Sequence, residues 1–215
     1  MSKELVMLEK EWSETERKTN IDTIMDIMNA NNGYVTTKQV SKMGIHRMYL
    51  NILKQKGIIE QVGTGIYIDV NKIEDSYYIL SQELPNIVYS HMTALYFHGF
   101  SIKAPGREYD ITIPYNYYNY KLKYHDLFYV SKDVYDLGLT TVCTPFGNLV
   151  KAYDLERCIC DIIRCRKRMD SEHVKHSIKE YVRSKDKDLT KLLDYAYKMN
   201  IKDEVLNYVE VFYEW

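Results

Sequence analysis

The sequence is poor in proline and glycine and contains no long apolar run. Only 4 prolines and 9 glycines occur among 215 residues. No segment reaches the roughly 18 consecutive apolar residues that a membrane-spanning helix needs. The first residues, MSKELVMLEKEW, are charged and lack the apolar core of a secretory signal peptide. We therefore expect a cytoplasmic protein that does not associate with a membrane.

The few cysteines also lack the spacing of a metal site or a disulfide framework. Cys143, Cys158, Cys160 and Cys165 form no Cys-x-x-Cys pair, and no histidines with matching spacing lie nearby. A structural zinc ion needs four convergent ligands. We expect four reduced thiols, no metal ion and no cofactor.

Acidic residues are absent from one window of the chain, although the net charge of the whole chain is only −1. Residues 34–59 contain five basic residues and no Asp or Glu, whereas residues 1–33 carry a net negative charge. A second basic stretch, 164–187, holds nine basic and four acidic residues. Binding of an anionic partner would therefore depend on local fields rather than on total charge.

Tyrosine, in contrast, is abundant, with 21 residues. A tyrosine ring can pack in the interior while its hydroxyl keeps a hydrogen bond. We interpret the excess mainly as a core built from tyrosine rings.

The apolar periodicity divides the chain into two domains, residues 1–78 and 79–215, of α+β class. In the first, we expect helices at 3–31, 37–43 and 46–56, with Asn20 as an N-cap within the first, and then a hairpin that turns at residues 63–65. This order of elements is that of a winged helix-turn-helix. Residues 69–78 are polar and are interpreted as an exit and linker.

The second domain is expected to hold a small sheet followed by a helical C-terminal tail. We expect short helices at 76–84 and 90–98, the latter capped by Ser90. Strands are predicted at 108–113, 127–130, 139–144 and 148–152, and helices at 154–168, 171–183, 188–199 and 201–213.

The helix at 46–56 has the two faces that a recognition helix needs. Ile45, Tyr49, Leu50 and Leu53 share the face that packs inward, whereas Arg47, Met48, Asn51, Lys54 and Gln55 lie on the other side. Arg reads guanine and Asn reads adenine in the major groove. Lysines and hydroxyl groups contact phosphates, which position a protein without specifying sequence. The predicted DNA-binding residues are Thr36, Thr37, Lys38, Lys42, His46, Arg47, Asn51, Lys54, Lys56 and Thr64.

Three segments resemble AbiEi-family antitoxins. The run GIHRMYLNILKQKGIIEQVGTGIYI resembles the family's N-terminal domain through Gly44, Ile45, Leu53, Gly57, Gly65 and Tyr67. The segment YSHMTALYFHGFS matches a second family motif at Ser90, Thr93, Ala94, Leu95, His98 and Gly99. YDLERCICDII matches a third at Glu156, Arg157 and Asp161, with Cys158 in place of the usual Thr.

The resemblance implies a bifunctional antitoxin of a type IV toxin–antitoxin system. The winged helix would bind inverted repeats of double-stranded DNA in its own operon promoter and repress it. The C-terminal domain would counter a nucleotidyltransferase-like toxin without forming a stable complex with it. Residues that could carry antitoxicity are Arg157, Arg164, Arg166, Lys167 and Arg168.

Each of these second-domain residues also has a structural interpretation. Arg157 and Asp161 are spaced i, i+4 and can form a buried ion pair, and Glu156 can bridge to the sheet. His98 can cap the end of its helix. The basic cluster at 164–168 can be a solvated helix end instead of a site that binds phosphate or RNA.

Two other classes of function are alternatives to an antitoxin. A metal-dependent nuclease needs clustered carboxylates with a nearby lysine, but no Glu-x-Lys follows Asp110 on the next strand, and His125-Asp126 stands alone. No Gly-rich phosphate loop and no HExxH motif occurs. We therefore do not expect an enzyme. The second alternative is a winged-helix regulator whose second domain senses a ligand or a partner.

Overall fold

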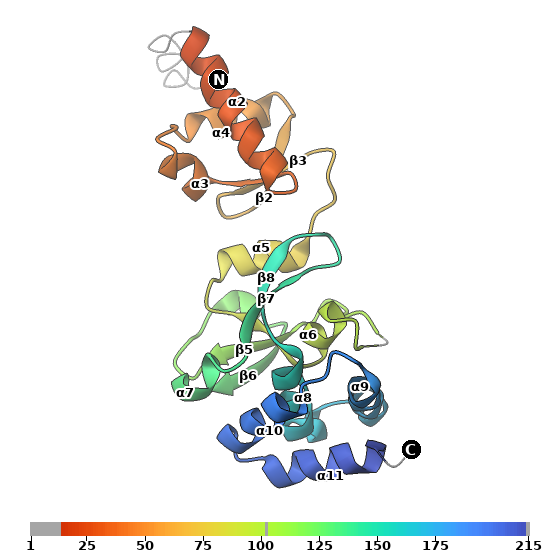
Figure 1. Ribbon diagram of the computed structural model, residues 1–215. Coiled ribbons are helices and arrows are strands. Elements are labelled where there is room, and N and C mark those ends of the chain that lie inside the picture. Colours follow the sequence, from red (N-terminus) through yellow and green to blue (C-terminus); the bar gives the residue numbers. More distant parts are fainter. Residues whose placement is uncertain (1–13, 102, 214–215) are drawn as a thin grey trace. The chain divides into compact units, whose positions relative to one another are not determined.

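The computed structural model describes residues 14–101 and 103–213 (Figure 1). The part of the first predicted helix that covers residues 3–13 lies outside the described residues. The chain divides into two compact units: the described residues up to Glu83 with Phe146–Asn148, and Leu84–Pro145 with the described residues from Leu149 onward.

The N-terminal unit is a winged helix-turn-helix. Its elements in chain order are α2 (Glu14–Ala30), β1 (Tyr34–Thr36), α3 (Thr37–Lys42), α4 (Met48–Gln55), β2 (Ile59–Gly63), β3 (Ile66–Asp69) and α5 (Ser76–Glu83). The strands form an antiparallel sheet in the order β1-β3-β2. The predicted order of helix, strand, two helices and hairpin is therefore confirmed.

The core of this unit lies between the helices and the sheet. Ile24 and Met28 of α2 pack with Val40 of α3 and with Tyr49 and Leu53 of α4. Burying an aliphatic or aromatic side chain of this size stabilises a fold by about 1.5–3 kcal/mol. The apolar faces of α2, α3 and α4 thus hold the three helices together in one unit.

Two local predictions in this unit are wrong. Asn20 does not cap a second helix, because α2 continues without a break from Glu14 to Ala30. Met48 does not lie on the exposed face of α4; its side chain is buried, because it shares a helical stripe (i, i+4) with Ile52, which packs against the core.

The polar segment 69–78 is only partly a linker, because Asp75 within it is fully buried. The Asp75 carboxylate accepts hydrogen bonds from the N–H groups of Tyr77 (3.0 Å) and Tyr78 (3.1 Å), which fixes the start of α5. It also accepts one from Asn148 Nδ2 at 2.8 Å, and its own N–H donates to the Tyr34 hydroxyl at 2.6 Å. The segment therefore anchors α5 to the N-terminal unit.

The second unit is an α+β structure with one mixed sheet and a helical C-terminal part. Its elements are β4 (Val88–Tyr89), α6 (His91–Phe97), β5 (Asp110–Pro114), η1 (Tyr120–Leu122), β6 (Asp126–Val130), α7 (Lys132–Tyr135), β7 (Leu139–Cys143), β8 (Leu149–Tyr153), α8 (Leu155–Arg164), η2 (Arg166–Arg168), α9 (Ser171–Arg183), α10 (Leu189–Lys198) and α11 (Lys202–Tyr213).

The sheet has the order β6-β5-β4-β8-β7. Strand β4 lies at its centre, antiparallel to β5 and parallel to β8. The four longer strands were predicted, but β4 was not, because two residues are too short to show a period. Residues 154–168 were predicted as one helix, but they form α8 and the separate 3-10 turn η2.

Aspartates begin three helices of the second unit. The side chains of Asp154, Asp170 and Asp188 accept hydrogen bonds from the first backbone N–H groups of α8, α9 and α10. A side chain that satisfies these N–H groups stabilises a helix start by about 1 kcal/mol. These caps explain why the predicted boundaries in this part of the chain lie close to those observed.

Helix α8 is the centre of the helical part. Every residue from Leu155 to Ile163 is buried, and α8 contacts α6, α9, α10 and α11. All four cysteines are free thiols, and Cys158 and Cys160 are buried in this helix. Burial raises the pKa of both thiols. None of the helices within the described ranges is both long and apolar enough to cross a lipid bilayer.

The packing of α5 predicts where the first unit can be cut from the chain. Ile79 packs against Ile66 and Ile68, and the Glu83 carboxylate accepts a hydrogen bond from the Thr64 N–H at 2.8 Å. A fragment of residues 1–83 should therefore be more stable than one of residues 1–78, by roughly 2–3 kcal/mol. Urea unfolding followed by circular dichroism measures the difference. A fragment of residues 1–86 serves as the control and should match 1–83; equal stability of all three fragments would contradict the role given to α5.

Candidate nucleic-acid interface

The helix-turn-helix is built from α3, a turn at residues 43–45, and α4. Thr36 begins α3 with a capping box: its hydroxyl accepts from the Gln39 N–H, and the Gln39 side chain accepts from the Thr36 N–H. Gly44 in the turn has a φ of +74°, a conformation that glycine adopts without strain. Ile45 then enters the core and sets the start of α4.

Helix α4 separates an apolar face from a polar one. Tyr49, Leu50 and Leu53 have no exposed surface. Arg47 and Asn51 are exposed, so the burial of the inward face leaves both side chains at the surface near the start of the helix. The structure therefore places together the two residue types that read base edges in a major groove.

Most of the other predicted DNA-binding residues are also at the surface of this unit. The exposed ones are Lys38, Lys42, His46, Lys54, Lys56 and Thr64. Lys54 Nζ donates to Gln61 Oε1 on β2 at 3.2 Å, which holds this ammonium group beside the hairpin. The imidazole of His46 acts as a local cap, since its Nδ1 accepts a hydrogen bond from the Met48 N–H at 3.2 Å.

Thr36 and Thr37 differ from the rest because their polar groups are engaged within the protein. The hydroxyl of Thr36 belongs to the capping box. The N–H of Thr37 donates to the Gly65 carbonyl oxygen at 2.8 Å, and its hydroxyl donates to the same oxygen at 3.3 Å. A Cβ at Gly65 would lie 2.9 Å from the Thr37 Oγ1. Thr37 therefore joins α3 to the tip of the hairpin, and the predicted phosphate contact of the Thr37 N–H is wrong.

In the second unit, Arg157 is a buried structural residue. It has no exposed surface, and its Nε donates to both carboxylate oxygens of Asp161 at 3.1 Å. Its Nη1 donates to the carbonyl oxygens of Val134 (2.6 Å) and Leu137 (2.7 Å). Burial acts to lower the pKa of Arg157, but the Asp161 carboxylate raises it overall, so the guanidinium is charged. Arg157 therefore cannot form part of an exposed antitoxicity surface.

Glu156 does not bridge to the sheet, as the sequence suggested, but to the helical part. Its Oε1 accepts from the Tyr181 hydroxyl at 3.3 Å and from the Asp188 N–H at 3.1 Å, and its Oε2 pairs with Lys191 at 3.0 Å. The prediction missed this because α10 follows Glu156 by more than thirty residues. His98 ends α6, and its Nε2 lies 2.8 Å from the Tyr153 carbonyl oxygen.

The predicted basic cluster has two kinds of members. Arg164, Lys167 and Arg168 are exposed and Arg166 is partly buried, and two of the four, Arg166 and Arg168, pack against aromatic rings. The guanidinium of Arg166 lies 5.9 Å from the ring centre of Tyr208, and that of Arg168 lies 4.3 Å from the ring centre of Phe128. The charges of Arg166 and Arg168 are therefore partly covered by aromatic rings.

A small cavity adjoins this cluster. Its volume is about 260 Å³, and Arg166, Lys167, Lys175, Ser171, Val174 and Tyr208 line it. Three cationic side chains around one hollow favour an anionic occupant.

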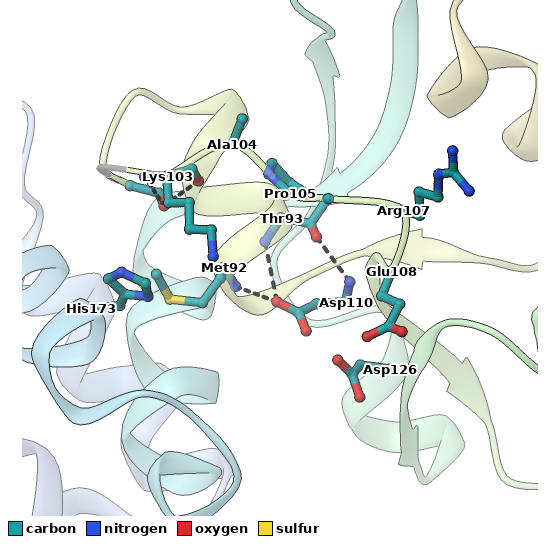
Figure 2. A pocket seen from close by; sticks show the side chains of 12 residues that line it. Met92, Thr93, Lys103, Ala104, Pro105, Arg107, Glu108, Asp110, Asp126 and His173 are labelled. Carbon is teal, nitrogen blue, oxygen red and sulfur yellow. Dashed lines mark hydrogen bonds between the residues drawn. The ribbon is translucent and has the colours of Figure 1, made fainter.

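A larger cavity, of about 390 Å³, opens beside α6 and β5. Figure 2 shows Lys103 and His173 on one side of it and Glu108 and Asp126 on the other, with Asp110 between them. The cavity thus carries charges of both signs. No group of three or more His, Cys, Asp or Glu side chains among the described residues is arranged to hold a metal ion.

Asp110 and Thr93 join β5 to α6 by reciprocal hydrogen bonds. The Asp110 Oδ2 accepts from the N–H groups of Met92 (2.9 Å) and Thr93 (3.3 Å), while the Thr93 Oγ1 accepts from the Asp110 N–H at 2.8 Å. The predicted capping role of Ser90 is therefore wrong: Ser90 stands at the N-cap position, but its hydroxyl makes no cap hydrogen bond. That hydroxyl lies 2.8 Å from the Nδ1 of His91 and accepts from the Thr112 hydroxyl.

Comparisons with known proteins support the N-terminal assignment. Residues 25–68 match the family described as "Transcriptional regulator, AbiEi antitoxin". This confirms the predicted resemblance over the helix-turn-helix and hairpin, and supports a DNA-binding regulator of the antitoxin type. The chain is also similar in fold to the crystal structure of the RV2827C protein from Mycobacterium tuberculosis, with a TM-score of 0.53 and 14% identity over 87% of this chain and 77% of that one. No curated protein sequence matches the chain significantly.

The environment of Asp110 predicts a pH-dependent contribution to stability. Burial, followed by the nearby Asp126 carboxylate, raises the pKa of Asp110 from 3.8 to about 6. Between these values the folded protein holds a proton that the unfolded chain has released, so stability falls as the pH rises through this window. Asp110→Asn stays neutral over this range. Its free energy of unfolding relative to that of wild type should therefore increase by roughly 1–3 kcal/mol from pH 4 to pH 7.

Urea unfolding at pH 4.5 and pH 7.5 tests this prediction. Asp186→Asn, at an exposed position, is the control and should follow wild type at both pH values. An Asp110→Asn variant whose stability relative to wild type is the same at both pH values would show that Asp110 ionises normally.

Proposed function

We propose that this protein is the antitoxin of a type IV toxin–antitoxin system, and that it represses its own operon by binding inverted repeats in the promoter. The observation that carries the proposal is the polar face of α4, where Arg47 and Asn51 are exposed within a segment that has no acidic residue. The family matched by residues 25–68 consists of transcriptional regulators described as antitoxins. Both observations concern the N-terminal unit.

Within this proposal, the residues divide by the part of the DNA that they contact. Arg47 and Asn51 read base edges, and Lys38, Lys42 and Lys56 contact phosphates. Lys54, which is held beside β2 by Gln61, contributes to the same positive surface. Thr64 at the hairpin tip is exposed and can contact the phosphate backbone of the DNA from the wing.

We further propose that the second unit counters a nucleotidyltransferase-like toxin through its exposed cations. Such a toxin handles nucleotides, which are anions, and Arg164, Lys167 and Arg168 are exposed in the basic cluster. The adjoining cavity, with Lys175 on its wall, extends this positive surface.

A second candidate function is a winged-helix regulator that senses a ligand. The cavity beside Asp110, at about 390 Å³, lies within the size range of small-molecule sites. Binding of the operator would then change when the ligand occupies the cavity. The identity of the neighbouring gene separates the two candidates, because a toxin–antitoxin operon requires a toxin gene beside this one.

The first function test is DNA binding. We expect the double variant Arg47→Ala/Asn51→Ala to bind the operon's promoter DNA at least about tenfold more weakly than wild type, since each bidentate base contact is worth about 1–3 kcal/mol. Gel-shift titration on a promoter fragment measures this. Gln55→Ala, at an exposed position near the end of α4, is the matched control, and Lys42→Ala should reduce the salt slope by about 1 without changing sequence preference. Wild-type affinity of the double variant would contradict the assignment.

The second function test is rescue from the toxin expressed from an unrelated promoter, so that repression plays no part. We expect the charge reversal Arg164→Glu/Lys167→Glu to weaken rescue of growth. Arg166 and Arg168 are left intact because they pack against rings, and their loss would mix packing with charge. The control is Lys132→Glu/Lys202→Glu, two exposed cations elsewhere in the unit. Unchanged rescue by the first variant would remove the basic cluster from the mechanism.

A further inference from the structure

The connection between β5 and β6 has an unusual composition. Residues 114–125, PYNYYNYKLKYH, contain five tyrosines and two lysines and no acidic residue. The function proposed above assigns nothing to this segment, which we call the tyrosine loop. It leads to β6, which pairs with β5 at one end of the sheet order.

The rings of the tyrosine loop are not part of the core. Tyr118 is 80% exposed, Tyr124 69%, Tyr120 66% and Tyr115 62%. A single exposed aromatic ring is common on protein surfaces, but several in one short segment mark an interaction site. The loop therefore exposes four of its five rings to solvent.

The loop also has a defined conformation. The Asn119 side chain accepts a hydrogen bond from the Lys121 N–H at 3.0 Å, which begins η1. The Leu122 side chain is buried, and the His125 N–H donates to the Leu122 carbonyl oxygen at 3.0 Å. The exposed rings are thus carried on a backbone that is anchored in the unit, which lowers the entropy lost on binding.

Positive charge accompanies the rings. Lys123 is exposed, and its Nζ lies 4.4 Å from the ring centre of Tyr124. A cation held over one aromatic ring can contact a phosphate while the neighbouring rings contact an apolar planar group.

We propose that the tyrosine loop binds single-stranded nucleic acid by stacking bases on its exposed rings, with Lys123 neutralising phosphate. Stacking needs open base faces, which a duplex does not offer, so this site is distinct in chemistry from the recognition helix α4. Every base has a planar face, so the binding is tolerant of sequence.

Two other partners fit the loop less well. Insertion into a lipid surface needs exposed aliphatic or large apolar anchors, but the one aliphatic residue in the loop, Leu122, is buried. Protein interfaces are also rich in tyrosine, yet they are depleted in lysine. The combination of tyrosine, asparagine and lysine without acidic residues favours a polyanion with aromatic groups.

The test measures the affinity of the full-length protein for short unstructured strands. The probes are fluorescein-labelled 12-nucleotide oligo(U) and oligo(dT), followed by fluorescence anisotropy. We expect Tyr118→Ala/Tyr120→Ala/Tyr124→Ala to weaken binding at least about tenfold. The corresponding triple Phe variant should bind within about threefold of wild type, because stacking requires the ring and not the hydroxyl. Tighter binding of oligo(U) than of oligo(dT) would identify RNA as the ligand, and the reverse would identify DNA.

Single substitutions keep the test independent of folding. Tyr118→Ala should weaken binding, whereas Tyr197→Ala, at an equally exposed ring on α10 (71% exposed), should not. The variant Arg47→Ala/Asn51→Ala should retain single-strand binding even though it loses binding to the promoter duplex. The proposal is overturned if wild type binds neither oligonucleotide, whether or not it binds anionic phosphatidylglycerol vesicles. It is also overturned if the triple Ala variant binds like wild type, or if the triple Phe variant loses as much affinity as the triple Ala variant.

Discussion

The guanidinium of Arg157 is fully buried, and several segments of the second unit supply the groups that contact it. Asp161 balances its charge from the next turn of α8, the carbonyl oxygens of Val134 and Leu137 accept from its Nη1, and the Tyr153 ring centre lies 4.1 Å from it. Removing one partner of a buried pair costs several kcal/mol, because the remaining charge has no water around it.

This requirement also shapes the backbone around the pair. Gly138 has a φ of +75°, and a Cβ there would lie 2.6 Å from the Cβ of Arg157. The loop after α7 can therefore close over the arginine only with glycine at this position. The central helix α8, the end of β8 and this loop form one structure around a single charge, and the helices α9, α10 and α11 pack around it. The motif that resembles the antitoxin family thus acts as a structural centre.

Much of this fold was predictable from the sequence, because local chemistry determines it. Helix α4 followed from the spacing of Ile45, Tyr49 and Leu53, and the later helices followed from their apolar periodicity. The central strand β4 was not predictable, since its two residues acquire their role only from the neighbours β5 and β8. The capping of α6 by Asp110 instead of Ser90 depends on the same long-range pairing of strands.

The candidate sites show the same division between local and long-range information. The exposure of Arg47 and Asn51 was expected from helical periodicity. The cavity beside Asp110 joins residues from α6, β5, β6 and α9, which no short motif connects. The abundance of tyrosine suggested a tyrosine-rich core, and Tyr34, Tyr49 and Tyr89 are buried as expected. Composition gave no indication that a further group of rings is exposed in one loop, because exposure depends on the tertiary structure.

The separation of the two faces of α4 has a consequence for how such proteins diverge. The residues that hold the helix in place, Tyr49, Leu50 and Leu53, are different from the exposed Arg47 and Asn51. Surface substitutions away from the core usually change stability by less than about 0.5 kcal/mol. The outer positions of α4 can therefore change while the scaffold persists. Under the DNA-binding role proposed above, duplicated copies of such a gene can acquire separate operators and avoid cross-regulation within one genome.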